Sequence, residues 1–125
     1  MKEFFIPGNV PSSKNSKVWT GKFMVWSKAA QKYRRNTKKD WLIHKIEFRK
    51  EVIKAVSGNK YPLKVSFKFI RGSKHKFDYV NPAQTILDIM VDSGWISDDN
   101  ADMILPVFEP YEYNKENPGV IIKIL

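Results

Sequence analysis

A stretch of 29 residues without proline or glycine, residues 28–56, most limits the folds open to this chain. Apolar side chains recur in it near helical spacing, and lysine and arginine recur on the other side. Ser27 precedes the stretch as a favoured N-cap residue, and Ser57-Gly58-Asn59 follows it as a typical helix end. We therefore expect one long amphipathic helix over residues 28–56. Its predicted apolar face holds Tyr33, Thr37, Trp41, Leu42, Ile46, Ile53 and Val56.

Short strands are predicted on both sides of this helix. Before it, residues 3–6 form a strand that stops at Pro7-Gly8, and residues 18–26 form a hairpin around Gly21. After it, residues 63–70 alternate apolar and polar side chains, which is typical of a half-buried strand. Residues 102–109 and 120–125 are predicted to be the last strands.

A second helix is predicted to begin at Asn81-Pro82. Asparagine is a good cap, and proline suits the first helical position, where no backbone N–H is required. We expect this helix to run to about Ser93, with Gly94 as the left-handed residue that follows it. The order of elements predicts a single small α+β domain over residues 1–125, a mixed β-sheet packed with two helices.

The composition excludes several classes of protein to which this chain could otherwise belong. The chain has 125 residues, no cysteine and two histidines, which excludes a disulfide framework, a thiolate zinc site and a histidine-rich metal site. No apolar run approaches the ~20 residues of a membrane span, and Pro7-Gly8 interrupts the N-terminal segment too early for a signal peptide. We expect a cytoplasmic protein that makes no contact with membranes.

Charge is divided unevenly along the chain. Residues 1–76 carry 20 Lys/Arg and 4 Asp/Glu, whereas residues 77–125 carry 2 Lys/Arg and 9 Asp/Glu. A basic surface attracts a polyanion, and clustered carboxylates repel one unless a cation lies between them. This division predicts a metal-dependent enzyme acting on nucleic-acid phosphates. The candidate phosphate contacts are Lys14, Lys17, Lys28, Arg34, Arg35 and Lys76, and Trp19, Phe23 and Trp26 are either stacking surfaces or core aromatics.

The aspartates after residue 77 carry the predicted chemistry. Along the second helix, Asn81, Gln84, Asp88 and Asp92 share one polar face. The following turn presents Asp98-Asp99-Asn100. If that turn folds against the helix, its carboxylates converge with Asp78 and Asp88 and require a divalent cation, for which hard oxygen ligands favour Mg²⁺ or Mn²⁺. Three simpler interpretations stay open: Asp98-Asp99-Asn100 shapes its own turn, Asp88 and Asp92 belong to a solvated helix face, and Asp78 is a residue beside a helix N-terminus, favoured there by the helix dipole.

Two segments have a recognisable motif spacing. Residues 78–84 read Asp-Tyr-Val-Asn-Pro-Ala-Gln, and Asp88 and then Gly94-Trp95-Ile96-Ser97-Asp98-Asp99 follow. Upstream, Pro11 and Asn15 form a Pro-x-x-x-Asn loop before the hairpin. In these residues, and over nearly its whole length, the chain resembles the RusA family of Holliday junction resolvases, common in phages and prophages. The family's Asp-x-Asp-Asn-x-x-Lys motif, its next Asp and its Asp-Asp pair align without a gap.

The resemblance implies a homodimeric, Mg²⁺-dependent endonuclease (Mn²⁺ is possible) that resolves four-way DNA junctions by paired phosphodiester hydrolysis in a bacterial host cytoplasm. It implies that Asp78 and Asp99 are catalytic metal ligands, and that Asp88 and Asp98 support the metal. Asn15 joins the DNA contacts. Two positions depart from the family: Val80 replaces the second motif Asp, and Gln84 replaces the catalytic Lys. These departures motivate the alternative of a non-catalytic protein that binds branched or single-stranded DNA.

Overall fold

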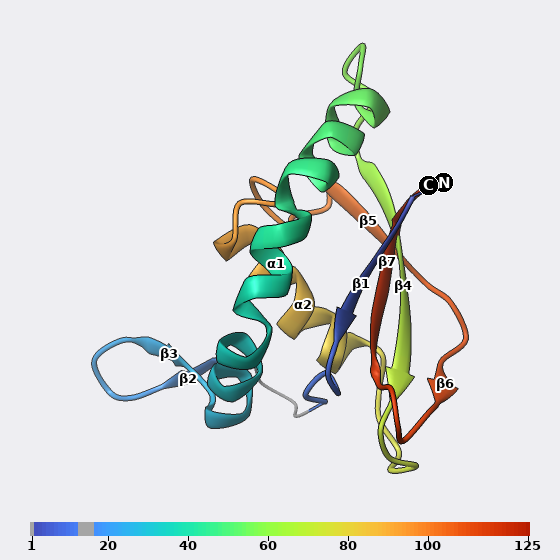
Figure 1. Cartoon of the computed structure of the whole chain (residues 1–125). Helices are drawn as coiled ribbons and strands as arrows, with labels where there is room; N and C mark the ends of the chain where they lie inside the picture. The colour runs from blue at the N-terminus through green and yellow to red at the C-terminus, as the bar shows by residue number, and fades with distance from the viewer. Residues whose placement is uncertain (1, 13–16) are drawn as a thin grey trace.

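The computed structural model describes residues 2–12 and 17–125, and it places two helices on one face of a β-sheet (Figure 1). The predicted α+β class, the mixed sheet and the two helices are confirmed. In chain order the elements are β1 Glu3–Pro7, β2 Lys17–Trp19, β3 Met24–Trp26, α1 Lys28–Ala55, β4 Leu63–Arg71, α2 Val80–Asp92, β5 Ile104–Phe108, β6 Glu112–Tyr113 and β7 Gly119–Ile124. The short strand β6 was not predicted.

The main sheet has the strand order β1-β7-β4-β5, and β6 pairs with the end of β4. β7 is antiparallel to both of its neighbours, whereas β4 and β5 are parallel and are joined through α2. Alternate residues of each strand face the helices, because side chains in a strand point to opposite faces in turn. The buried sheet residues include Phe4, Ile6, Leu63, Val65, Phe67, Phe69, Ile104, Val120 and Ile122.

Helix α1 begins and ends almost where it is predicted. Its start is fixed by Ser27, whose Oγ accepts a hydrogen bond from the Ala30 N–H at 3.2 Å. The buried face of α1 differs in part from the predicted one. Leu42, Ile46 and Ile53 were expected to be buried, yet they are 58%, 68% and 64% exposed. The residues of α1 that do face the sheet are Ala30, Tyr33, Thr37, Trp41, Phe48 and Val52. Neither α1 nor any other helix in the described residues is apolar over a length that could cross a membrane.

Helix α2 starts earlier than predicted. Its cap is Tyr79 instead of Asn81, and Asn81 lies in the first turn, where its N–H donates to the Asp78 carbonyl at 3.0 Å. The end of the helix is as predicted, because Gly94 adopts a φ of +77°, a conformation that glycine reaches without strain. The core side of α2 is almost entirely apolar, and its buried residues are Pro82, Ala83, Thr85, Ile86, Leu87, Ile89 and Met90.

An aromatic cluster fixes the segment that follows α2. The Trp95 ring is fully buried, and its centroid lies 4.8 Å from that of Trp41 and 4.5 Å from that of Phe48. The Trp95 Nε1–H donates to the Trp41 carbonyl at 2.9 Å, and Arg49 donates to the Trp95 carbonyl at 3.2 Å. These contacts hold the start of the 96–100 turn against α1.

Candidate functional site

The polar face of α2 is the scaffold of the candidate site. Gln84 and Asp92 are exposed on it, and Asn81 and Asp88 are half-buried. The residues between them point into the core, which gives the helix the two-sided pattern predicted from the sequence. A row of amide and carboxylate groups therefore runs along the helix.

The structure brings Asp88 and Asp99 together. Burial raises the pKa of Asp99 above its ordinary range, and the negative charge of Asp88 raises that pKa further. Gln84 Nε2 donates to Asp88 Oδ1 at 2.8 Å, which orients this carboxylate. Asp99 reaches its position because Trp95, four residues earlier, is held in the core. Asp88 and Asp99 are called the carboxylate pair below.

The Asp98 side chain forms hydrogen bonds within its own turn. One of its oxygens accepts the Asp99 N–H at 2.7 Å, and the other accepts a hydrogen bond from the Asn100 side chain at 3.0 Å. These hydrogen bonds lower the pKa of Asp98, since they favour its charged form. Asn100 in turn accepts the Asp102 N–H at 3.0 Å. The local turn chemistry left open from the sequence is thus present at Asp98 and Asn100.

Asp78 lies at the other end of the polar face. It is exposed just before the first turn of α2, and eight helical residues, about 12 Å of rise, separate Val80 from Asp88. Asp78 lines a cavity of about 460 Å³ that neither Asp88 nor Asp99 lines. Within residues 2–12 and 17–125, no three histidine, aspartate or glutamate side chains are grouped so as to hold a metal ion. The expected convergence is therefore seen for the carboxylate pair, with Asp78 outside it. The cavity beside Asp78 is lined by Ser12, Lys76, Phe77, Asp78, Asn81 and Tyr111.

A buried arginine that was not predicted, Arg71, contacts two of the residues that line this cavity, Ser12 and Phe77. The Arg71 guanidinium donates to the Val10 carbonyl at 2.6 Å and to the Ser12 Oγ at 3.0 Å, and it stacks over the Phe77 ring at 4.6 Å. Burial lowers the pKa of Arg71. Alternation along β4 was the available signal, because residue 71 continues the inward-facing positions 63, 65, 67 and 69. Arg71 thus ties the N-terminal loop to Phe77, next to Asp78.

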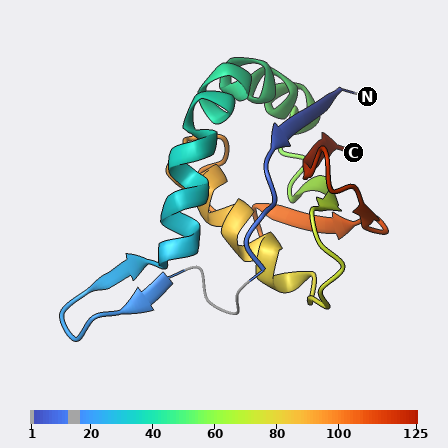
Figure 2. The ribbon, with the colours of Figure 1, turned by 60° about the horizontal axis from the view of Figure 1, so that its bottom comes forward.

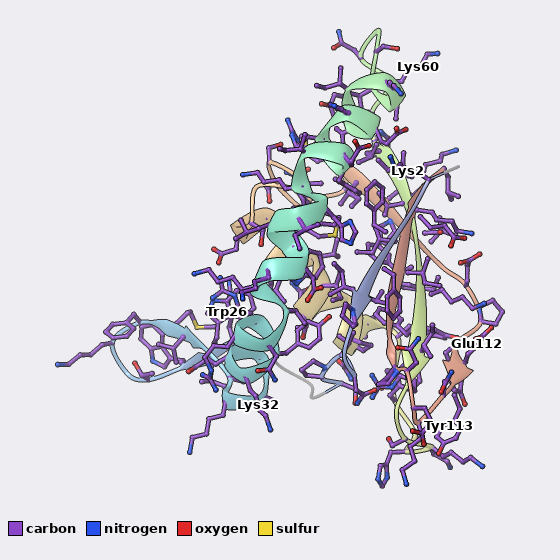
Figure 3. All side chains as sticks on the ribbon, viewed as in Figure 1. Lys2, Trp26, Lys32, Lys60, Glu112 and Tyr113 are labelled. Carbon is purple, nitrogen blue, oxygen red and sulfur yellow. The ribbon has the colours of Figure 1, made fainter. Side chains whose placement is uncertain are left out.

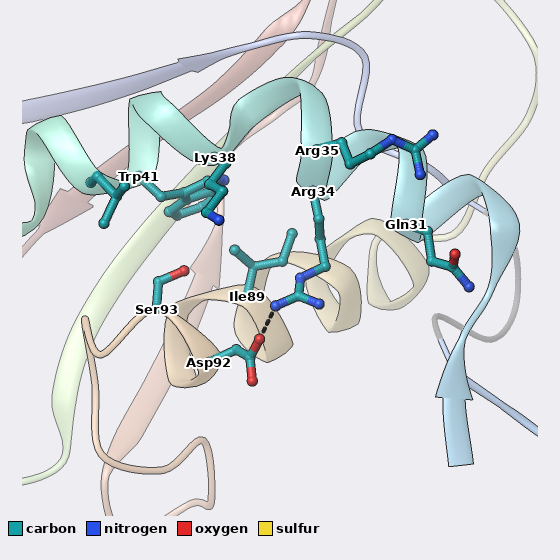
Figure 4. A pocket seen from close by; sticks show the side chains of 9 residues that line it. Gln31, Arg34, Arg35, Lys38, Trp41, Ile89, Asp92 and Ser93 are labelled. Atoms are coloured by element: carbon teal, nitrogen blue, oxygen red, sulfur yellow. Dashed lines mark hydrogen bonds and ion pairs between the residues drawn. The ribbon is translucent and has the colours of Figure 1, made fainter. Parts of the chain in front are cut away.

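A second cavity, of about 500 Å³, lies between the first half of α1 and the end of α2 (Figure 4). Arg34 spans it and forms an ion pair with Asp92. The Arg34 guanidinium also lies over the Trp26 ring, 4.2 Å from its centroid. The remaining charged groups in the cavity wall, Arg35 and Lys38, are positive, so the cavity has an excess of cations.

The predicted DNA contacts occupy three places. Lys17 lies on β2 and Lys28 opens α1, and both are exposed near the hairpin. Arg34 and Arg35 line the cavity between the helices, and Lys76 lines the cavity beside Asp78. Figure 3 shows Lys32 pointing away from α1 and Trp26 at the base of the hairpin. Lys14 and Asn15 lie outside the described residues.

The carboxylate pair alone is a better match to Mg²⁺ than the larger group of aspartates predicted from the sequence. Proteins often hold Mg²⁺ with one or two carboxylates, and waters and substrate phosphates complete its coordination. Burial and then repulsion from Asp88 raise the pKa of Asp99, and a bound cation would relieve the repulsion. Val80 offers no ligand, although it is 65% exposed on the same helix.

Comparison with known proteins adds no evidence for or against the sequence motif. No family model matches the chain, and a search of curated proteins gives no match either. The expected relation to the RusA family therefore rests on the motif spacing alone. The structure itself contributes the carboxylate pair, the cavity beside Asp78 and the basic first half of α1.

Proposed function

We propose that this protein is a Mg²⁺-dependent, structure-selective endonuclease that hydrolyses phosphodiester bonds in four-way DNA junctions. The observation that carries the proposal is the carboxylate pair, a site for one hard cation at helix α2, whose C-terminal end at Asp92 lines the cation-rich cavity beside α1. Acid side chains repel DNA phosphates unless a cation lies between them. An acidic site beside a basic surface therefore suits a metal-dependent nuclease better than a simple DNA-binding surface.

Each residue has a distinct part in this proposal. Asp88 and Asp99 would hold the metal, which supplies an activated water and stabilises charge on the phosphate when bound. Gln84 orients Asp88 through its hydrogen bond, but it brings no positive charge. Arg35 and Lys76, which line the cavities at the two ends of the polar face, neutralise the phosphates of the bound strand. Asp78 remains a candidate third acid at the far end of the face.

A second function is favoured by a specific observation. Val80 and Gln84 replace an acid and a cation of the family motif, and in the described residues no three acids are placed so that they could hold a metal ion. A protein with these features could bind branched or single-stranded DNA without cutting it. Incubation of a synthetic four-way junction with the protein and Mg²⁺ or Mn²⁺ separates the two functions. Paired nicks near the branch point support the nuclease, and intact strands in a saturated complex support the binder.

Reversing the two departures from the motif gives a prediction. We expect Val80→Asp combined with Gln84→Lys to preserve or raise the rate of junction cleavage. The exposed position 80 accepts a carboxylate without burial, and a lysine at position 84 adds a positive charge beside Asp88. The measurement is the single-turnover cleavage rate with Mg²⁺. Loss of cleavage in a folded double variant would mean that this chain uses a different arrangement from the motif.

We also propose that the protein acts as a homodimer. Resolution of a four-way junction needs two symmetric cuts, and a two-fold dimer supplies two sites on a two-fold substrate. Helix α1 carries a stripe of exposed aliphatic side chains, Leu42, Ile43, Ile46 and Ile53, on the side that does not face the sheet. Several large aliphatic side chains exposed on one helix are typical of protein–protein interfaces.

This dimer surface gives a further prediction. Ile46→Glu should weaken self-association by about tenfold or more, since it places a charge in the centre of the stripe, where Ile46 is 68% exposed in the single chain. Sedimentation equilibrium without DNA measures the dissociation constant. Leu105→Glu is the matched control, because Leu105 is 45% exposed on β5, away from the stripe. Equal effects of the two substitutions, or a monomeric wild type, would count against this interface.

A further inference from the structure

The hairpin of β2 and β3 extends from the body of the protein beside the start of α1 (Figure 2). Within the described part of the chain its two strands pair only with each other, with Val18 opposite Val25 and Trp19 opposite Met24. The turn is closed by Thr20, whose Oγ1 donates to the Phe23 carbonyl at 3.1 Å. Such an arm adds no strand to the main sheet, so its side chains are available for another purpose.

Large apolar side chains are displayed on this arm. Trp19 is 63% exposed and Phe23 is 61% exposed, and Met24 is exposed beside them. Trp26, at the base, is different: it packs against the core, and Arg34 and Lys17 cover its ring at 4.2 and 5.0 Å. Trp26 therefore anchors the arm, while Trp19 and Phe23 contribute nothing to the core. Their exposure has an energetic cost in water, which points to a binding role.

The charge around the arm indicates what it binds. Residues 17–39 carry eight lysine and arginine residues and no aspartate or glutamate. A polyanion would be attracted to that surface, whereas the same cationic surface on a second copy of the chain would be repelled from it. Aromatic rings set among cations are the combination that stacks on nucleobases while the cations follow the phosphates.

We propose that the β2–β3 hairpin is a stacking arm that places Trp19 and Phe23 against unpaired or unstacked bases at a DNA branch point. This inference rests on the proposed function and adds the means by which branched DNA is preferred. In linear duplex DNA the base faces are already stacked on one another, so the arm has no surface to bind. At a junction or in a single strand the faces are accessible, and each aromatic ring can cover one.

The test uses the full chain with Trp19→Ala and Phe23→Ala together, without divalent metal. Affinity is measured for a four-way junction, a single strand and a linear duplex. For the first two probes we expect a loss of about 5- to 150-fold per aromatic residue, and for the duplex a change within about twofold. Leu105→Ala with Val107→Ala is the control, since it removes exposed apolar side chains from β5 and should leave all three affinities unchanged.

Other results would overturn the stacking arm. Unchanged junction affinity in the double variant would do so, and so would a wild type that binds the junction no better than the duplex. A double variant that becomes monomeric in sedimentation would show that the arm packs on a second copy instead. The proposed nuclease activity can be refuted separately from the stacking arm. If the wild type prefers the junction through Trp19 and Phe23 but cuts it with neither Mg²⁺ nor Mn²⁺, the stacking arm is supported and the nuclease activity is refuted.

Discussion

Asp99→Asn should lower the rate of four-way junction cleavage with Mg²⁺ by more than about a hundredfold. The substitution keeps the size of the side chain and removes one of the two charges in the carboxylate pair. Loss of a residue that only supports a metal ligand already costs about 10- to 100-fold, so loss of a ligand itself should cost more. The single-turnover rate at saturating protein measures this effect independently of product release.

The same variant also gives a readout that does not depend on activity. Because the pKa of Asp99 is raised in the folded protein, its stabilising contribution is present at low pH and is lost as the pH rises through that pKa. At pH 7 without metal, Asp99→Asn should therefore be at least as stable as the wild type. Mg²⁺ should raise the Tm of the wild type and leave that of Asp99→Asn unchanged.

Two further aspartates serve as matched comparisons. Asp98→Asn should retain most of the cleavage rate, because an amide oxygen can still accept the Asp99 N–H that shapes the turn. Asp78→Asn should cause a smaller loss than Asp99→Asn, since Asp78 lies outside the carboxylate pair. A loss at Asp78 equal to that at Asp99 would mean that Asp78 joins the metal once DNA is bound. Wild-type rates in Asp99→Asn would refute the proposed site.

The helices were predictable because local sequence decides where they form. Ser27 caps α1, 29 residues without proline or glycine sustain it, and Gly94 ends α2 in a left-handed conformation. The buried side of α1 was less predictable, because the helix has more apolar positions than the sheet can cover. Thr37 belongs to the core because its hydroxyl donates to the Tyr33 carbonyl and accepts the Trp41 Nε1–H. Ile46 has a greater hydrophobicity and is exposed.

The candidate site was predictable in its residue types and only partly in its geometry. The spacing of Gln84, Asp88 and Asp92 placed them on one helix face, which follows from helical periodicity alone. The proximity of Asp99 to Asp88 depends on the packing of Trp95 among the aromatic residues of α1, a tertiary contact that no local pattern encodes. The role of Arg71 is likewise tertiary, since its partners are about 60 residues earlier in the chain.

Binding to DNA should be strongly dependent on salt, whatever the outcome of the cleavage assays. If the cations of residues 17–39 neutralise about six phosphates, the affinity for a four-way junction should fall about a thousandfold between 50 and 200 mM salt. The fall arises because each neutralised phosphate releases condensed counterions, and that release contributes less free energy as salt increases. A titration without divalent metal, repeated at several salt concentrations, measures the slope.

Paired variants locate the contacts that produce this slope. Arg35→Ala with Lys38→Ala removes two cations from the cavity between α1 and α2, and should lower the slope by about two. Lys115→Ala removes an exposed cation from the acidic half of the chain, and should leave the slope unchanged. If the two variants gave equal slopes, the first half of α1 would not be the surface that holds the strands. A flat salt response in the wild type would remove the electrostatic basis for DNA binding, because a neutral binding mode would need none of the eight cations in residues 17–39.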